Sequence, residues 1–170
     1  MKLGHPHIVL YRPEIPQNTG NIGRLAAGAG CRLHLVKPFG FDSRDKNLRR
    51  AGLDYWPFLD LEIHQDMEEI LRGFSPERLA FFSKKATKPY WEMPVSTDVF
   101  VFGQETKGLP SSLTEAYADQ LYQIPMFHPG VRSHNLANAV SVIVYHRIVE
   151  IYGRKQHTNV LFPAPGHHDP

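Results

Sequence analysis

Three segments of the sequence carry glycine and polar residues in patterns that suit ligand binding. The first, Asn18–Arg24, reads Asn-Thr-Gly-Asn-Ile-Gly-Arg, and the second, Gly103–Leu109, reads Gly-Gln-Glu-Thr-Lys-Gly-Leu. The third, Ile124–Tyr145, is a short apolar run, a loop, a polar Ser133–Asn135 step and a long apolar stretch with helical character. Loop amides and a helix N-terminus are good partners for polar or anionic groups, so these segments predict a ligand site.

Two common nucleotide-binding motifs fail when tested against these segments. The glycines of Gly103–Leu109 have Walker A spacing, but Leu109 and Pro110 stand where a phosphate loop needs Lys and Ser or Thr. The Rossmann fingerprint fails because Leu33 follows Gly28-Ala-Gly where the third glycine belongs. The sequence therefore argues against a nucleotide hydrolase and against an NAD enzyme.

The ten histidines raise the question of a metal site. Three of them, His128, His134 and His146, lie in or next to the third segment, but their spacing matches no zinc pattern. Cys31 is the only cysteine, so no cysteine pair can assist, and an internal disulfide is excluded. We expect solvated or hydrogen-bonded histidines and no metal.

Composition fits a single domain of ordinary size that works in the cytoplasm. The 170 residues carry a net charge of only +2, so affinity for nucleic acid has to come from local clusters of basic residues. The sequence shows no signal peptide and no apolar run long enough for a membrane helix. We expect one domain over residues 1–153 and a flexible tail over residues 154–170, which has little apolar periodicity.

Segments with strand and helix periodicity alternate along the chain, which predicts an α/β fold with a mainly parallel sheet. Ligands bind such sheets beyond the carboxyl ends of the strands, where loops follow Tyr11, Phe102 and Ile124. The expected strands are His7–Tyr11, Arg32–Val36, Leu59–Ile63, Leu79–Ser83, Val99–Phe102 and Leu121–Ile124. The expected helices are Asn21–Ala29, stopped by Gly30, and Met67–Arg72, Ser111–Ala118 and Leu136–Ile151.

Taken together and in order, the three segments resemble the three motifs of the SpoU group of SPOUT methyltransferases. The resemblance covers about Ile8 to Ile151 and is strongest to the small tRNA (cytidine/uridine-2′-O-)-methyltransferases that act at the anticodon wobble nucleotide, position 34. Ile8–Pro16, Lys46–Tyr55 and Asn135–Tyr145 carry this finer similarity. Other readings stay open: 2′-O-methylation of ribosomal RNA or of another tRNA site, an RNA-binding module without catalysis, and, more remotely, a metal-bound or nucleotide-binding protein.

The resemblance implies a mainly parallel sheet flanked by helices with a deep C-terminal trefoil knot, and a homodimer whose active site is shared between subunits. It also implies S-adenosylmethionine as methyl donor, S-adenosylhomocysteine as product, tRNA as partner and no metal. The residues implied around the donor, largely through backbone groups, are Phe82, Gly103, Ile124, Met126, Ser133 and Leu136. The implied RNA-binding residues are Asn18, Asn21, Lys46, Arg49, Arg50 and Asn135, with Lys84, Lys85 and Lys88 as a second basic cluster.

The implied catalytic residues are Arg24, which would reach the partner subunit's donor, Tyr145 and Glu105. Each also has a plainer interpretation: a surface arginine, a core aromatic residue, and a carboxylate that pairs with Arg24 or with a backbone amide. Similarly, Phe82, Ile124 and Leu136 could be core residues, and either Ser133 or Asn135 could cap the last helix. The basic clusters could simply be solvated faces of the molecule.

Overall fold

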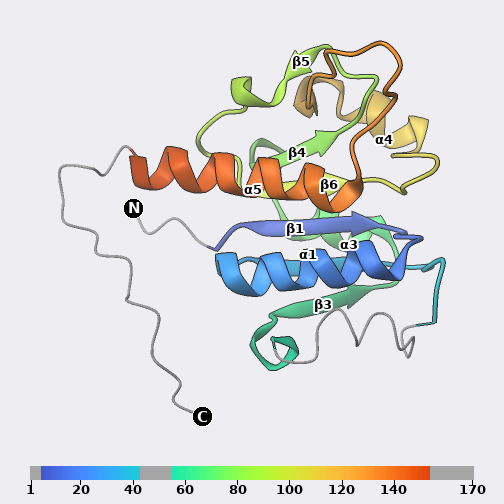
Figure 1. Cartoon of the computed structure of the whole chain (residues 1–170), viewed down its shortest axis with the longest axis vertical. Helices are drawn as coiled ribbons and strands as arrows, with labels where there is room; N and C mark the ends of the chain where they lie inside the picture. The colour runs from blue at the N-terminus through green and yellow to red at the C-terminus, as the bar shows by residue number, and fades with distance from the viewer. Residues whose placement is uncertain (1–4, 43–54, 154–170) are drawn as a thin grey trace.

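A seven-stranded sheet in which every pair of neighbouring strands is parallel runs through the molecule (Figure 1). The structure, a computed structural model, describes residues 5–42 and 55–153. The strand order is β3-β2-β1-β6-β4-β7-β5. The strands are β1 (His7–Tyr11), β2 (Arg32–Val36), β3 (Leu61–His64), β4 (Leu79–Phe82), β5 (Lys88–Pro89), β6 (Val99–Phe102) and β7 (Leu121–Gln123). The predicted α/β fold with a mainly parallel sheet is confirmed.

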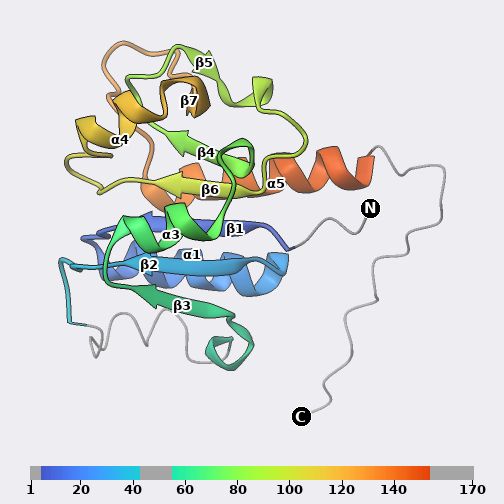
Figure 2. The ribbon, with the colours of Figure 1, turned by 180° about the vertical axis from the view of Figure 1, so that it is seen from behind.

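Helices cover both faces of the sheet because the central strands are apolar on both sides. The helices are α1 (Pro16–Ala29), α3 (Met67–Gly73), α4 (Ser111–Ala116) and α5 (Leu136–Gly153). On one face, α1 and α5 pack side by side over Leu10, Leu35 and Phe102 (Figure 1). On the other face, α3 packs against alternate residues such as Val9 and Val36 (Figure 2). Period-two alternation therefore divides the core into two apolar layers.

The observed elements differ from the predicted ones mainly at their ends. Helix α1 begins at Pro16 rather than Asn21, since proline is well suited to the first turn, and it ends at Gly30 in a left-handed conformation with φ 65°, as predicted. Strand β3 begins two residues later and ends one residue later than expected. Strand β5 was not predicted, because its two residues, Lys and Pro, show no apolar alternation. None of the helices in the described ranges has the length and apolar content needed to cross a lipid bilayer.

The strand order brings separate parts of the sequence to one edge of the sheet. Strands β1, β6, β4 and β7 are consecutive neighbours, and parallel strands end at the same edge. The loops that follow them come from near residues 12, 103, 83 and 124 of the chain. Topology therefore collects the three segments with unusual glycine and polar patterns in one place.

Three histidines interrupt the apolar layer beneath α3. His34 is 2% exposed, and the rings of His7 and His64 lie on either side of it. Burial, followed by the proximity of His7 and His64, lowers the pKa of His34 to about 3, so this ring is neutral at neutral pH.

Candidate active site

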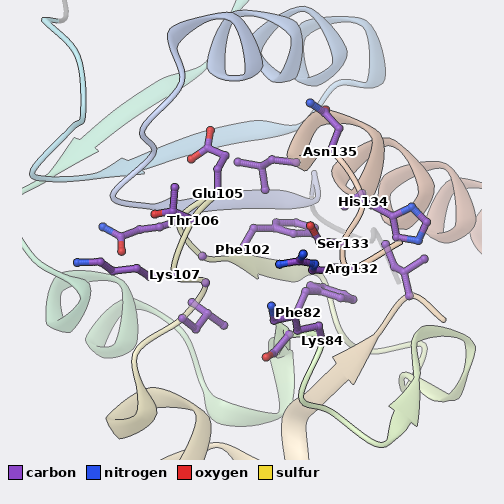
Figure 3. A pocket seen from close by; sticks show the side chains of 18 of the residues that line it. Phe82, Lys84, Phe102, Glu105, Thr106, Lys107, Arg132, Ser133, His134 and Asn135 are labelled. Carbon is purple, nitrogen blue, oxygen red and sulfur yellow. The ribbon is translucent and has the colours of Figure 1, made fainter. Parts of the chain in front are cut away.

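A cavity of about 410 Å³ lies beyond the carboxyl ends of β4, β6 and β7 (Figure 3). Its volume falls in the range of roughly 300–1,000 Å³ that is usual for small-molecule sites. All six residues that the family resemblance implied around the donor line it: Phe82, Gly103, Ile124, Met126, Ser133 and Leu136. The structure therefore brings this predicted set together, although their role in binding a donor stays a prediction.

The cavity has an apolar floor and a polar, mostly cationic rim. The rings of Phe82 and Phe102 stack with centroids 4.8 Å apart and an angle of 13° between their planes. Side chains of Lys84, Lys107 and Arg132 lie around the two rings (Figure 3). Phe82 and Phe102 also belong to the core, so the core interpretation of Phe82 is correct and does not conflict with a place in the wall of the cavity. Such a cavity suits a ligand with a flat apolar part and a polar or anionic end.

Gly103 is required by the way its own loop folds. A Cβ atom on Gly103 would lie 2.2 Å from the carbonyl carbon of Gly108 and 2.3 Å from the backbone nitrogen of Leu109. Gln104 and Gly108 exchange two backbone hydrogen bonds of 3.2 and 2.9 Å, and Gly108 has a φ of 71°. Glycine, which has no Cβ, therefore allows the Gly108–Leu109 peptide to approach this position closely.

Glu105 fastens this loop to the segment before α1. Its Oε2 accepts a hydrogen bond of 2.9 Å from the amide of Glu14, and its Oε1 accepts from the amide of Ile15 at 3.2 Å and from Asn18 Nδ2 at 3.1 Å. In return, the Glu14 carboxylate accepts hydrogen bonds from the amide and the hydroxyl of Thr106. The interpretation in which Glu105 pairs with backbone amides is thus confirmed, and a catalytic role for it stays a prediction.

Asn18 and Asn135 extend this network to the third segment. Asn18 is 6% exposed, and its Oδ1 accepts a 3.0 Å hydrogen bond from Asn135 Nδ2. Asn135 Oδ1 accepts from the amides of Ala137 and Asn138, at 2.9 and 3.3 Å, so Asn135 is the N-cap of α5. Between Ser133 and Asn135, the two capping candidates from the sequence, Asn135 is the one that caps. Both ends of the Asn18 amide are engaged within the protein, which gives no support to its predicted contact with RNA.

The other predicted helix residues lie outside the cavity of the single chain. Asn21 and Arg24 are exposed on α1, where the Arg24 guanidinium carbon is 5.2 Å from the centroid of the Tyr55 ring. Tyr145 is 52% exposed on α5, so its interpretation as a core aromatic residue is wrong. One chain therefore does not bring Arg24 or Tyr145 to the predicted donor site.

The structure describes the second of the two predicted basic clusters but not the first. The cluster of Lys46, Arg49 and Arg50 lies outside the described residues. In the second cluster, Lys84 and Lys85 are exposed and line the cavity, whereas the Lys88 ammonium donates a 2.9 Å hydrogen bond to the backbone oxygen of Asp119.

Sequence reasoning missed Phe102 and Arg132 in the wall of the cavity and the pairing of Glu14 with Thr106 beside it. Phe102 was assigned only to a strand, although its position as the last residue of β6 pointed to the cavity. Arg132 directly precedes the polar Ser133–Asn135 step, and a basic residue in a loop at a predicted ligand site was a usable signal. The partnership of Glu14 with Thr106 spans 92 positions, and nothing in local sequence indicated it.

A parallel α/β fold with a cavity beyond its carboxyl edge and a capped helix at the cavity wall is the architecture of many enzymes that bind cofactors or nucleotides. The model of the SpoU rRNA Methylase family matches residues 5–145, and the chain belongs to this family. The family resemblance seen in the three sequence segments is thereby confirmed. The predicted trefoil knot stays a prediction, which family membership supports.

Several relatives and solved structures are similar over most of the chain. The tRNA (cytidine(34)-2′-O)-methyltransferase of Saccharophagus degradans is 48% identical over 141 residues, which cover 82% of this chain and 91% of that protein. The enzyme of the same name from Escherichia coli K12 is 49% identical over 141 residues, which cover 82% and 89%. A solved structure that gives insights into the 2-OH methylation of C/U34 on tRNA has a TM-score of 0.81 and 41% identity, covering 87% of this chain and 97% of the other.

A more distant structure has the same fold. The SpoU methyltransferase AviRb from Streptomyces viridochromogenes, in complex with the cofactor AdoMet, has a TM-score of 0.77 and 20% identity and covers 89% of this chain and 60% of that one.

Adding one methyl group at Gly103 should be far more disruptive than adding one at Gly28. We expect Gly103→Ala to lower the free energy of unfolding by about 1–3 kcal/mol, the usual cost of overpacking, because the Gly108–Leu109 peptide must move. The matched control is Gly28→Ala in α1, where nothing lies within 4 Å of the added atom and a gain of about 0.5–1 kcal/mol is expected. Urea denaturation of both variants measures this difference, and equal stability of Gly103→Ala and the wild type would contradict it.

Two substitutions at Asn135 should separate its cap from its bond to Asn18. Asn135→Ala removes both, and the loss of the cap alone is expected to cost about 1 kcal/mol of unfolding free energy. Asn135→Asp keeps an oxygen for the amides of Ala137 and Asn138 but removes the donor to Asn18, so it should destabilise less. Denaturation curves of the two variants test this order, and an Asp variant less stable than the Ala variant would refute it.

Proposed function

We propose that this protein transfers a methyl group from S-adenosylmethionine to the ribose 2′-hydroxyl of nucleotide 34 of tRNA, a cytidine or a modified uridine at the anticodon wobble position. The supporting observation is that the family match over residues 5–145 includes every segment that builds the cavity. The relatives that resemble the chain along about nine-tenths of their own length carry the name tRNA (cytidine(34)-2′-O)-methyltransferase. The protein acts in the cytoplasm.

The composition of the cavity fits the donor. The stacked Phe82 and Phe102 rings offer an apolar surface to the adenosine part, and the cationic rim suits the carboxylate of the methionine part. The residues that hold it are Phe82, Gly103, Ile124, Met126, Ser133 and Leu136, largely through backbone groups. The donor would supply a methyl group on a positively charged sulfur. The 2′-oxygen takes this methyl group as S-adenosylhomocysteine leaves, and the hydroxyl proton passes to water, so the transfer needs no metal. What the protein contributes is alignment of the 2′-oxygen with the methyl carbon.

Arg24 serves the cavity of a second subunit. A guanidinium stays protonated at neutral pH, so Arg24 positions a phosphate and the ribose and does not accept the hydroxyl proton. Its place on the exposed face of α1, outside the cavity of its own chain, agrees with a role across a subunit interface. Tyr145 belongs to the same shared site.

The protein assembles as a homodimer through an apolar stripe on α5. Val142, Tyr145 and Val149 are 38%, 52% and 65% exposed, and their spacing of three and four residues places them on one side of the helix. An exposed apolar stripe of this kind is stabilised when a partner surface covers it. RNA then contacts Lys46, Arg49 and Arg50, together with Lys84 and Lys85 at the rim, through phosphate groups.

The proposed activity predicts one methylated position in tRNA. The protein should transfer labelled methyl groups from S-adenosylmethionine to total tRNA from a strain in which its gene is deleted, and nuclease mapping should place the label on nucleotide 34. A synthetic tRNA with 2′-deoxyribose at nucleotide 34 is the control and should accept no methyl group. Methylation of the deoxy substrate, or of ribosomal RNA in place of tRNA, would contradict the assignment.

The shared site can be tested by mixing two inactive variants. Arg24→Ala should keep donor affinity, measured by calorimetry, but lose methylation; Met126→Trp should fill the cavity and lose donor binding. When equal amounts of the two variants are unfolded and refolded together, about half of the dimers contain one chain of each kind. In such a dimer, one of the two sites combines an intact cavity with an intact Arg24 from the other chain. About a quarter of wild-type activity should therefore return. No recovery of activity in the mixture would show that Arg24 acts within its own chain or not at all.

A further inference from the structure

Two histidines and a glutamate on β2 and β3 direct their side chains at one another. Helix α3, which covers this face of the sheet (Figure 2), contacts the group through Glu69. His34 and Glu62 are paired across the two parallel strands, and His64 follows two residues later in β3, on the same face. His34 Nδ1 lies 3.0 Å from His64 Nε2 and 3.4 Å from Glu62 Oε2. His64 Nε2 lies 3.7 Å from the same carboxylate oxygen. Three potential ligand atoms thus form a nearly regular triangle.

The size of this triangle matches one face of a tetrahedral metal site. A zinc ion with bonds of about 2.0–2.1 Å holds neighbouring ligand atoms about 3.3–3.4 Å apart, which is close to the mean of the three separations. Two imidazoles and one carboxylate, with the fourth position left to water, are a ligand set that proteins use for zinc. Magnesium and calcium prefer oxygen ligands throughout and fit less well.

The second nitrogen of each ring already has a partner. His64 Nδ1 lies 3.1 Å from a carboxylate oxygen of Glu69 on α3, and His34 Nε2 lies 2.8 Å from His7 Nδ1. Metal-binding histidines usually donate their other N–H group to a carboxylate or another acceptor, which fixes the orientation of the ring. These contacts orient the rings of His34 and His64, and an ion bound at His34 Nδ1 and His64 Nε2 would place the ring protons on His34 Nε2 and His64 Nδ1.

The orientation of the Glu62 carboxylate is also fixed by a hydrogen bond. Its Oε1 accepts a 3.0 Å hydrogen bond from the Arg32 guanidinium, whose Nε donates to Asp60, so that Oε2 is the oxygen that faces the histidines. The side chains of His34, His64 and Glu62 are 3%, 15% and 44% exposed. The group of ligand atoms is therefore buried on the sheet side and open to solvent at Glu62.

We propose that His34, Glu62 and His64 bind a divalent transition-metal ion, and that the ion is zinc. The site has no residue in common with the cavity, so it is independent of methyl transfer. Strand β3 is an edge strand of the sheet. A bound ion would link β3 to β2 through His34. It would also connect β3 to α3, because Glu69 on α3 contacts the ligand His64. Sequence spacing did not indicate the site, because its ligands come from two strands separated by more than twenty residues.

Metal titration of the full chain, purified without an affinity tag and freed of metal with a chelator, tests the proposal. Calorimetry with zinc chloride should detect one site that is lost in Glu62→Gln and His64→Gln. Glu69→Gln, which removes only the partner of His64 Nδ1, should weaken binding about 10–100-fold. The matched controls, Glu68→Gln on α3 and His128→Gln in an exposed loop, should bind zinc as the wild type does.

Cobalt and NMR measurements distinguish this site from binding by other histidines. Cobalt chloride added to the wild type should give the intense visible absorption of a four-coordinate ion. If circular dichroism shows that a variant does not fold, ¹⁵N NMR spectra of the histidine rings in the wild type replace the measurement on that variant. Zinc should shift the ring-nitrogen resonances of His34 and His64 and leave those of His128 unchanged. Unaltered zinc affinity in folded Glu62→Gln and His64→Gln, a six-coordinate cobalt spectrum, or unshifted His34 and His64 rings would each overturn the proposal.

Discussion

The carboxylate of Glu105 is the contact on which the arrangement of the cavity depends. The backbone amides of Glu14 and Ile15 precede α1, and amides in the first turn of a helix have no partner within the helix. Glu105 supplies that partner from a loop about ninety residues further along the chain, and a negative charge is favoured at a helix N-terminus. Within the described residues, the other side-chain hydrogen bonds between the loop from Gly103 to Leu109 and the segment before α1 are those between Glu14 and Thr106.

The same network determines where α5 begins. Asn18 donates to Glu105 and accepts from Asn135, and Asn135 caps α5, so hydrogen bonds run without a break from the middle loop through α1 to the last helix. Each of the three segments that make up the family resemblance supplies one member of this network. The motifs are therefore related physically as well as by sequence order, because each one satisfies polar groups of another.

Much of the fold followed from local patterns, since the buried strands are apolar runs and their ends are marked by glycine or proline. Strands β1, β2 and β6 have the predicted bounds, and Gly30 ends α1 as expected. The six predicted cavity residues came from the family resemblance, because composition alone does not separate a cavity wall such as Phe82 from ordinary core. Long-range pairing could not be predicted: the Glu105 network and the group of His34, Glu62 and His64 join residues whose proximity is set by strand order, which local periodicity does not contain.

The proposed dimer surface and the proposed metal site belong to opposite faces of the sheet, because side chains alternate between the two faces along each strand. The face under α1 and α5 carries Arg24, Tyr145 and the exposed stripe of α5, through which we propose that a second subunit binds. The face under α3 holds the three histidines, and a partner on α5 would leave Glu62 open to solvent. A metal ion bound there could stabilise the edge strand in either the monomer or the dimer. The proposed donor binding, subunit assembly and metal binding should therefore each be altered by a substitution that leaves the other two in place.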